Sequence, residues 1–237
     1  MEFKDLIRLY EEKKKQHGEA AFRHISELLS EAKILHKKGW SKSPTPNKDH
    51  EQSWRAFKGK NLEKLILYMI EGGVHTLGLK VVDGNTLERS SQKLSEELSQ
   101  VKRNLLVDYG EFGEHLPDVD IIIYDPSDCG VIAVVSSKVT LRERIAQTGY
   151  WKIKLSQDEV TRHVKVFFVT PDEDKTLNIR TPAKKGRAIV EIDTDGSYVM
   201  TEEDIEESDR VKSFDKFFID LKNLIDAKRK GKRKKQE

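Results

Sequence analysis

The stretch that decides the fold is residues 117–152, PDVDIIIYDPSDCGVIAVVSSKVTLRERIAQTGYWK. Two runs rich in β-branched residues, 119–124 and 130–135, flank the turn-forming tetrapeptide DPSD, so the stretch predicts a β-hairpin. Asp120 stands at the start of the first strand, and Lys138 follows the second. Because antiparallel pairing places these two ends side by side, we expect a carboxylate and an ammonium to meet at one edge of a sheet.

The expected pairing of Asp120 with Lys138 has complementary chemistry. A carboxylate can bind a hard cation such as Mg²⁺, and a nearby lysine can orient or deprotonate a water that attacks phosphorus. Arg142, Glu143 and Arg144 then open a predicted helix, 141–152. Arginine donates paired hydrogen bonds to guanine and glutamate accepts one from cytosine, so this helix is suited to read G·C pairs in double-stranded DNA. The alternative is a solvated helix face with ordinary ion pairs.

Helical periodicity surrounds the hairpin on both sides. It predicts two helices within 3–36, one over 52–71 that Gly72-Gly73 is expected to end, a polar helix over 87–104, and a closing helix over 214–230. Residues 164–169 predict a further strand, and 187–192 with 197–200 predict a second hairpin around Asp195-Gly196. This order predicts an α/β (α+β) fold with a mixed central sheet flanked by helices. The proline-containing segment 39–49 favours a boundary between a helical N-terminal region, 1–48, and a larger domain, 49–237.

Composition narrows the possible classes of protein. The 237 residues can bury one sizeable core, and the formal net charge of +2 does not by itself call for nucleic acid. The last ten residues, KRKGKRKKQE, form a basic tail that either keeps the protein in solution or contacts phosphates. Cys129 is the sole cysteine, which excludes a disulfide framework and a multi-cysteine zinc site. Since no apolar run is long enough for a signal peptide or membrane span, a cytoplasmic location without membrane contact is expected.

Two stretches resemble a known superfamily of nucleases. Asp120 followed by Ser136-Ser137-Lys138 resembles the PD-(D/E)xK nucleases, in the variant where serine replaces the acidic residue. Within them, KVTLRERI at 138–145 matches the pattern of AgeI-like restriction endonucleases, a branch that reads CCGG. Independently, Gln52-Ser53-Trp54 with Gly59 and Glu63 is similar to the helix that precedes the catalytic sheet in that branch.

The resemblance implies a prokaryotic type II restriction endonuclease that uses Mg²⁺ to cut double-stranded DNA at a palindrome with a CCGG-type core. It also implies that Asp120 and Glu63 bind Mg²⁺, that Lys138 serves the attacking water, and that residues 142–144 contact bases. A palindromic site is matched by a two-fold homodimer, which could join into larger assemblies. One departure is Lys152, which stands where this branch often has an acidic residue. It leaves a second metal position in doubt, with Glu63 in the compensating role.

Several further side chains are candidates for the site. Asp118 belongs to the literal Pro-Asp dipeptide, but Asp120 directly precedes the apolar run and is preferred. The Ser137 carbonyl is a candidate metal ligand. Arg55, one turn before Gly59, and Gln147, one turn after the Arg142–Arg144 segment, are candidate DNA contacts, with surface ion pairing as the alternative for Arg55. The seven histidines show no metal-ligand spacing and receive no role.

Two other functions remain open from the sequence. The chain could be a structure-specific nuclease of DNA repair or recombination, which recognises branched or damaged DNA by shape. It could also be a non-catalytic, helical DNA-binding protein in which Asp120 and Lys138 form an ordinary ion pair at the edge of the core.

Overall fold

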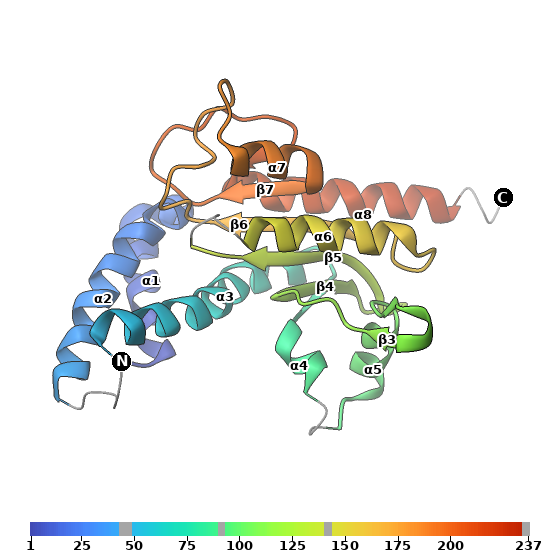
Figure 1. Cartoon of the computed structure of the whole chain (residues 1–237), viewed down its shortest axis with the longest axis horizontal. Coiled ribbons are helices and arrows are strands. Elements are labelled where there is room, and N and C mark those ends of the chain that lie inside the picture. The colour runs from blue at the N-terminus through green and yellow to red at the C-terminus, as the bar shows by residue number, and fades with distance from the viewer. Residues whose placement is uncertain (43–48, 90–92, 140–143, 234–237) are drawn as a thin grey trace.

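The structure is a computed structural model that describes residues 1–42, 49–89, 93–139 and 144–233. Its centre is a mixed six-stranded sheet in the order β1-β4-β5-β6-β7-β8 (Figure 1). The strands are β1 (Lys80–Asp83), β4 (Ile121–Asp125), β5 (Gly130–Ser137), β6 (Lys165–Thr170), β7 (Gly196–Val199) and β8 (Val211–Ser213). Strands β1, β4 and β5 are antiparallel, whereas β5 to β8 run parallel. The predicted mixed sheet is confirmed.

The β4–β5 hairpin forms the middle of this sheet, as the sequence predicts. Its register pairs Ile121 with Val135 and Asp125 with Gly130, with an irregularity after Ile123. Nearly every residue of both strands is buried, because helices cover both faces of the sheet. A strand buried on both sides needs a continuous apolar run, which is the pattern that the sequence shows here.

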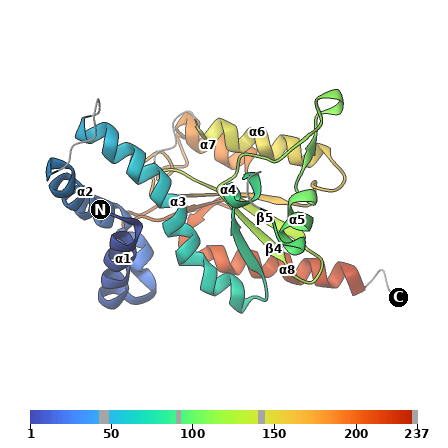
Figure 2. The ribbon, with the colours of Figure 1, turned by 90° about the horizontal axis from the view of Figure 1, so that it is seen from below.

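Helices form a layer on each side of the sheet. α3 (His50–Thr76) and α8 (Phe217–Arg233) pack against one face, and α4 (Gly84–Glu88), α5 (Glu96–Arg103), α6 (Arg144–Gln157) and α7 (Lys185–Asp193) cover the other. Figure 2 shows α6 and α7 on the opposite side of the strands from α8. Burying apolar side chains of both sheet faces is the main favourable term in such a three-layer fold.

The N-terminal helices extend one of these two cores. α1 (Phe3–His17), the 3₁₀ helix η1 (Gly18–His24) and α2 (Ile25–Lys42) pack on α3 beside the sheet (Figures 1 and 2). Leu6, Ile25 and Leu28 are fully buried and belong to the same apolar cluster as Leu65 of α3 and Phe217 of α8. The predicted pair of N-terminal helices is confirmed, and their apolar core is continuous with that of the sheet.

Short elements complete the described chain. They are the two-stranded sheet β2 (Val107–Asp108) and β3 (Glu114–His115), and the 3₁₀ helices η2 (Gly110–Phe112) and η3 (Phe214–Lys216). Where one helix is predicted over 87–104, the structure has two, α4 and α5. The Ser95 hydroxyl caps the start of α5, because it accepts a hydrogen bond from Leu98 N–H. In the described parts of the chain, no helix is long and apolar enough to cross a membrane.

The predicted end of α3 at Gly72-Gly73 is wrong. The helix continues to Thr76 and ends where Gly78, at φ 78°, adopts the left-handed conformation and donates to the His75 carbonyl. Gly73 instead permits close packing, because a Cβ there would lie 2.4 Å from Cε1 of Phe218 on α8.

The predicted second hairpin is also wrong. Residues 185–193 form α7, and β7 pairs in parallel with β6 and β8. The Arg187 side chain is fully buried and donates to the Glu206 carbonyl and to the Leu177 carbonyl, so it sits on a helix that packs inward. Asp195-Gly196 therefore joins a helix to a strand, and its sequence resembles a hairpin turn only locally.

Candidate active site

Asp120 is held in place by the hairpin that follows it. Its backbone N–H donates to the Val135 carbonyl at 3.1 Å, and its Oδ2 accepts from the Ser137 backbone N–H at 2.6 Å. The Ser137 hydroxyl lies 3.3 Å from the same oxygen. From the other side, Gly84 N–H donates to the Asp120 carbonyl at 2.9 Å. The carboxylate is thus fixed between the ends of β1, β4 and β5.

Lys138 connects Asp120, at the start of the β4–β5 hairpin, to helix α3. Its Nζ lies 3.1 Å from both Asp120 carboxylate oxygens and 3.0 Å from Glu63 Oε1. The structure therefore brings together the three residues that the sequence singles out for catalysis, although Glu63 is 75 residues away from Lys138. We call Glu63, Asp120 and Lys138 the Lys138 cluster.

The electrostatics of the Lys138 cluster favour an added cation. Burial, and then the charge of Asp120, raise the pKa of Glu63 above its ordinary value, while the Lys138 ammonium acts in the opposite direction. Two carboxylates face one ammonium, which leaves one negative charge uncompensated among these three groups. Oxygen donors from carboxylates are what Mg²⁺ prefers, so the donor set fits this ion.

Two of the hollows in the described structure are lined by residues of the Lys138 cluster. One, of about 150 Å³, is lined by Asp120, Glu63, Lys138, Asp118 and Ser136, among others. The other, of about 260 Å³, brings in residues of α3: Arg55, Gly59, Lys60, Glu63, Lys138 and Val139 are among its lining residues. Arg55 is exposed and lines this second hollow together with Glu63 and Lys138.

The structure describes only some of the residues that are predicted to contact bases. Arg142 and Glu143 lie outside the described residues, and Arg144 is the first residue of α6, with its side chain undescribed. Gln147, one turn further along α6, donates from Nε2 to Asp118 Oδ2 at 2.6 Å. Gln147 and Asp118 therefore connect α6 to the segment that leads into Asp120.

Lys152 pairs with Asp195 and not with the Lys138 cluster, among the residues that the structure describes. Its Nζ instead lies 2.6 Å from Asp195 Oδ2, an oxygen that also accepts from Val166 N–H. Burial alone would raise the pKa of Asp195, but the hydrogen bonds from Lys152 and from Val166 N–H hold it below its ordinary value. The lysine in place of an acidic residue is thus explained by an ion pair that holds α6 against β6 and β7.

Some residues beside the site were missed by sequence reasoning. Asn85 and Glu88 of α4 and the buried Thr148 of α6 line the hollow at Asp120, and Lys60 lines the other. α4 is one turn long and carries no periodic signal, so nothing in the sequence pointed to it. Ser137 contributes its N–H and hydroxyl to Asp120, while a role of its carbonyl as metal ligand stays a prediction.

Comparisons with known proteins show the family of this chain. Residues 97–223 match the family model described as BsaWI restriction endonuclease type 2. The chain is 37% identical over 212 residues to the "Putative type II restriction enzyme MjaVIP" of Methanocaldococcus jannaschii, covering 84% of this chain and 92% of that protein. It is 34% identical over 126 residues to the "Probable type II restriction enzyme HpyAORF263P" of Helicobacter pylori, covering 53% of this chain and 64% of that protein.

A solved structure shares the fold. The specific restriction endonuclease AgeI in complex with DNA superposes with a TM-score of 0.54 at 14% identity, over 86% of this chain and 82% of that chain. Because the family model spans more than half of the residues and the archaeal relative is matched over nearly its whole length, the chain belongs to the BsaWI family of type II restriction endonucleases and is a site-specific deoxyribonuclease.

Proposed function

We propose that this endonuclease cuts double-stranded DNA at a palindrome with a CCGG-type core, in a reaction that depends on Mg²⁺ held by Asp120 and Glu63. The observation that supports it is the convergence of two carboxylates on one ammonium: Glu63 Oε1 and Asp120 Oδ1 lie 3.0 Å and 3.1 Å from Lys138 Nζ, beside an open hollow. The CCGG assignment rests on the resemblance of KVTLRERI at 138–145 to the AgeI-like pattern.

Each residue of the Lys138 cluster has a distinct task in this proposal. Asp120 is held rigidly by the Ser137 N–H, so its carboxylate defines a fixed position for phosphate and cation. Lys138 donates to both carboxylates and would orient the attacking water. Mg²⁺, when bound, would neutralise charge on the phosphate and make its bound water more acidic. Ser137 would add its carbonyl as a further oxygen ligand.

Recognition of the DNA is assigned to the start of α6 and to α3. Arg142, Glu143 and Arg144 would contact the G·C pairs, because paired guanidinium donors match guanine O6 and N7. Arg55, exposed beside the second hollow, would contact the DNA backbone. Gln147, engaged by Asp118 in the free protein, would contact a base only after giving up that hydrogen bond. A homodimer would match the two-fold symmetry of the site.

A digest with sequencing of the DNA ends tests the proposal. Plasmid is incubated with the purified protein and Mg²⁺, and then again with a chelator. We expect discrete fragments whose ends share one CCGG-containing palindrome, and no cutting with the chelator. Lys222→Ala, an exposed lysine on α8, serves as the control for Asp120→Ala and Lys138→Ala and should cut normally. Random ends, or unchanged cutting by Asp120→Ala, would contradict the proposal.

The recognition sequence is tested separately by binding. Duplexes with a central CCGG and with the same bases scrambled are compared in Ca²⁺, using the Asp120→Ala protein to prevent cleavage. We expect the CCGG duplex to bind at least about a thousandfold more tightly, the lower end for specific over non-specific sites. Equal affinity would favour recognition by DNA shape instead.

A further inference from the structure

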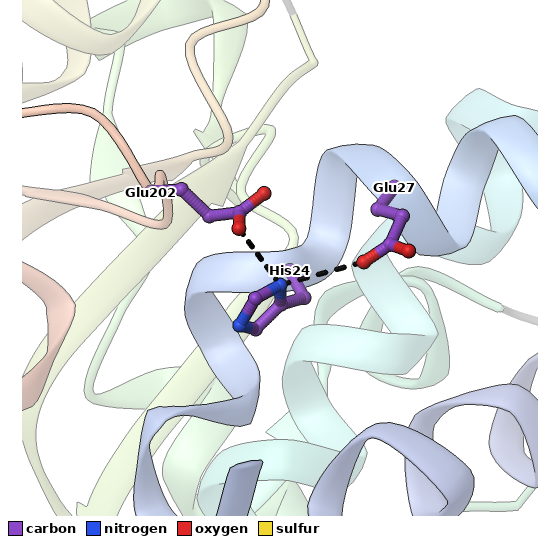
Figure 3. A group of neighbouring side chains, drawn as sticks. All are labelled: His24, Glu27 and Glu202. Atoms are coloured by element: carbon purple, nitrogen blue, oxygen red, sulfur yellow. Dashed lines mark ion pairs between the residues drawn. The ribbon is translucent and has the colours of Figure 1, made fainter. Parts of the chain in front are cut away.

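A second cluster of metal-ligating side chains lies away from the Lys138 cluster, where the N-terminal helices meet the sheet. We call it the His24 cluster: His24 of η1, Glu27 of α2 and Glu202, which follows β7 (Figure 3). His24 Nδ1 lies 3.0 Å from Glu202 Oε1 and 3.4 Å from Glu27 Oε2. No local sequence pattern predicts this cluster, because Glu202 is far from the other two residues along the chain.

The His24 imidazole is unusual in its hydrogen bonding. Its Nδ1 is buried and, among the residues that the structure describes, has no hydrogen-bond partner, even though two carboxylate oxygens lie close by. An N–H at this nitrogen therefore points at neither oxygen. A buried polar atom that makes no hydrogen bond is unfavourable, so the position of this nitrogen beside two carboxylates calls for an explanation.

A metal ion on the lone pair of His24 Nδ1 supplies that explanation. Zinc lies about 2.0–2.2 Å from nitrogen and carboxylate oxygen, so neighbouring ligand atoms around it are about 3.0–3.5 Å apart. The two separations from Nδ1, 3.0 Å and 3.4 Å, have this size. Ligand atoms that share an ion flank its bond to the imidazole instead of lying on it, which is why they would miss hydrogen-bond geometry.

The charge around the His24 cluster is also suited to a divalent cation. Glu27 and Glu31 both contact the buried ammonium of Lys13, at 2.9 Å and 2.8 Å. With Glu202, three carboxylates then face one ammonium, which leaves two negative charges among these four groups when His24 is neutral. Lys13 Nζ contacts the same Glu27 Oε2 that lies near His24, and because a carboxylate oxygen has two lone pairs, this oxygen can accept from Lys13 and bind an ion.

We infer that His24, Glu27 and Glu202 form a binding site for a divalent transition metal of the zinc type, which fastens the N-terminal helices to the catalytic sheet. One imidazole with two carboxylates suits zinc better than Mg²⁺, which takes oxygen ligands and keeps much of its water. His24 and Glu27 are three residues apart on one helical face, and Glu202 reaches them from the segment after β7 (Figure 3). The site is separate from the cluster proposed to cut DNA.

Calorimetry with Zn²⁺ tests this inference without any cleavage assay. The protein carries Asp120→Ala, to remove the catalytic carboxylate, and the buffer contains excess Mg²⁺. We expect one Zn²⁺ to bind per chain, and His24→Gln and Glu202→Gln each to weaken it by at least about tenfold. Glu203→Gln is the matched control, because Glu203 is the adjacent carboxylate but pairs with Lys175. It should leave the affinity unchanged.

Two further readouts separate a metal site from a purely structural role. Co²⁺ in place of Zn²⁺ should give visible absorption bands that Glu202→Gln removes, and Zn²⁺ should raise the melting temperature of the parent protein but not of that variant. Glu202 is half exposed, so this variant is expected to fold even where His24→Gln does not. The absence of Zn²⁺ binding, or equal binding by the parent, Glu202→Gln and Glu203→Gln, would overturn the inference. The His24 cluster would then be an ordinary ion pair between His24 and its two carboxylates.

Discussion

The Lys138 cluster and the His24 cluster both join one basic side chain to two carboxylates, at least one of which comes from a distant segment, but they differ in access to water. In the first, the Asp120 and Glu63 side chains are 11% and 23% exposed. In the second, Glu27 and Glu202 are 49% and 56% exposed. Water screens exposed charges, so removing a charged group should have a large effect in the partly buried Lys138 cluster and a small one in the more exposed His24 cluster.

The largest expected effect comes from Lys138→Ala. Removing the ammonium leaves Asp120 and Glu63 without this cationic partner and removes the group that we propose orients the attacking water. We expect the single-turnover rate of cutting to fall by about a thousandfold or more, the size typical for a positioned catalytic group. Affinity for DNA in Ca²⁺ should change little. A rate within tenfold of the parent would show that Lys138 is only an ion-pair partner.

Gly84→Ala should have the next largest effect, although Gly84 carries no functional group. A Cβ at this position would lie 1.9 Å from the Val119 carbonyl oxygen, so the backbone entering Asp120 must move. A displacement of about 1 Å in an active site reduces rates by about a hundredfold. The test compares cutting rates of Gly84→Ala and Gly72→Ala, since a Cβ at the exposed Gly72 would meet nothing within 4 Å. Normal cutting by Gly84→Ala would show that Asp120 tolerates the shift.

How far the sequence predicts this site depends on whether the contacts are local. Asp120 and Lys138 flank one hairpin, whose turn and β-branched strands are readable, and the predicted approach of the two side chains is confirmed. Glu63 lies on helix α3, far from the hairpin along the chain, and only the resemblance to AgeI-like endonucleases points to it. Gly84 and the Asp118–Gln147 hydrogen bond depend on tertiary packing that no local pattern encodes.

The rest of the fold follows the same division. Strands β4, β5 and β6 have apolar runs long enough to predict, whereas β1 and β8 have four and three residues and were missed. The sequence predicts a strand over 187–192, where the structure has α7, because a short apolar run does not distinguish the period of a helix from that of a strand. The burial of Arg187, which accompanies the helix, is a long-range interaction.

Asp172 is a buried carboxylate that accepts from N–H donors and forms no ion pair among the residues that the structure describes. It accepts from the backbone N–H groups of Thr176 and Leu177, yet burial raises its pKa to about 6. The folded state thus keeps a proton that the unfolded state loses near pH 4, so stability should fall as pH rises from about 4 to about 6. The expected loss is about 3 kcal/mol, from a pKa difference of roughly two units.

The Asp172 effect is isolated by difference. Asn tolerates the left-handed backbone of this position, at φ 50°, so Asp172→Asn should fold, and it does not titrate. Denaturant unfolding of both proteins at pH 4, 5, 6 and 7 should show the stability of the parent falling relative to the variant up to about pH 6 and then staying level. A constant difference across this range would mean that Asp172 ionises normally in the fold.

The smallest expected effect is that of Glu27→Gln in protein freed of metal by a chelator. The Glu27 side chain is half exposed, and an ion pair of this kind contributes about 0–1 kcal/mol. The free energy of unfolding should therefore change by less than about 1 kcal/mol without metal. With Zn²⁺ present the same substitution should matter more, because the ion binds the folded protein through this carboxylate. If Glu27→Gln were strongly destabilising without metal, Lys13 and His24 would already hold the N-terminal helices in place, and the contrast with the Lys138 cluster would rest on geometry instead of solvent access.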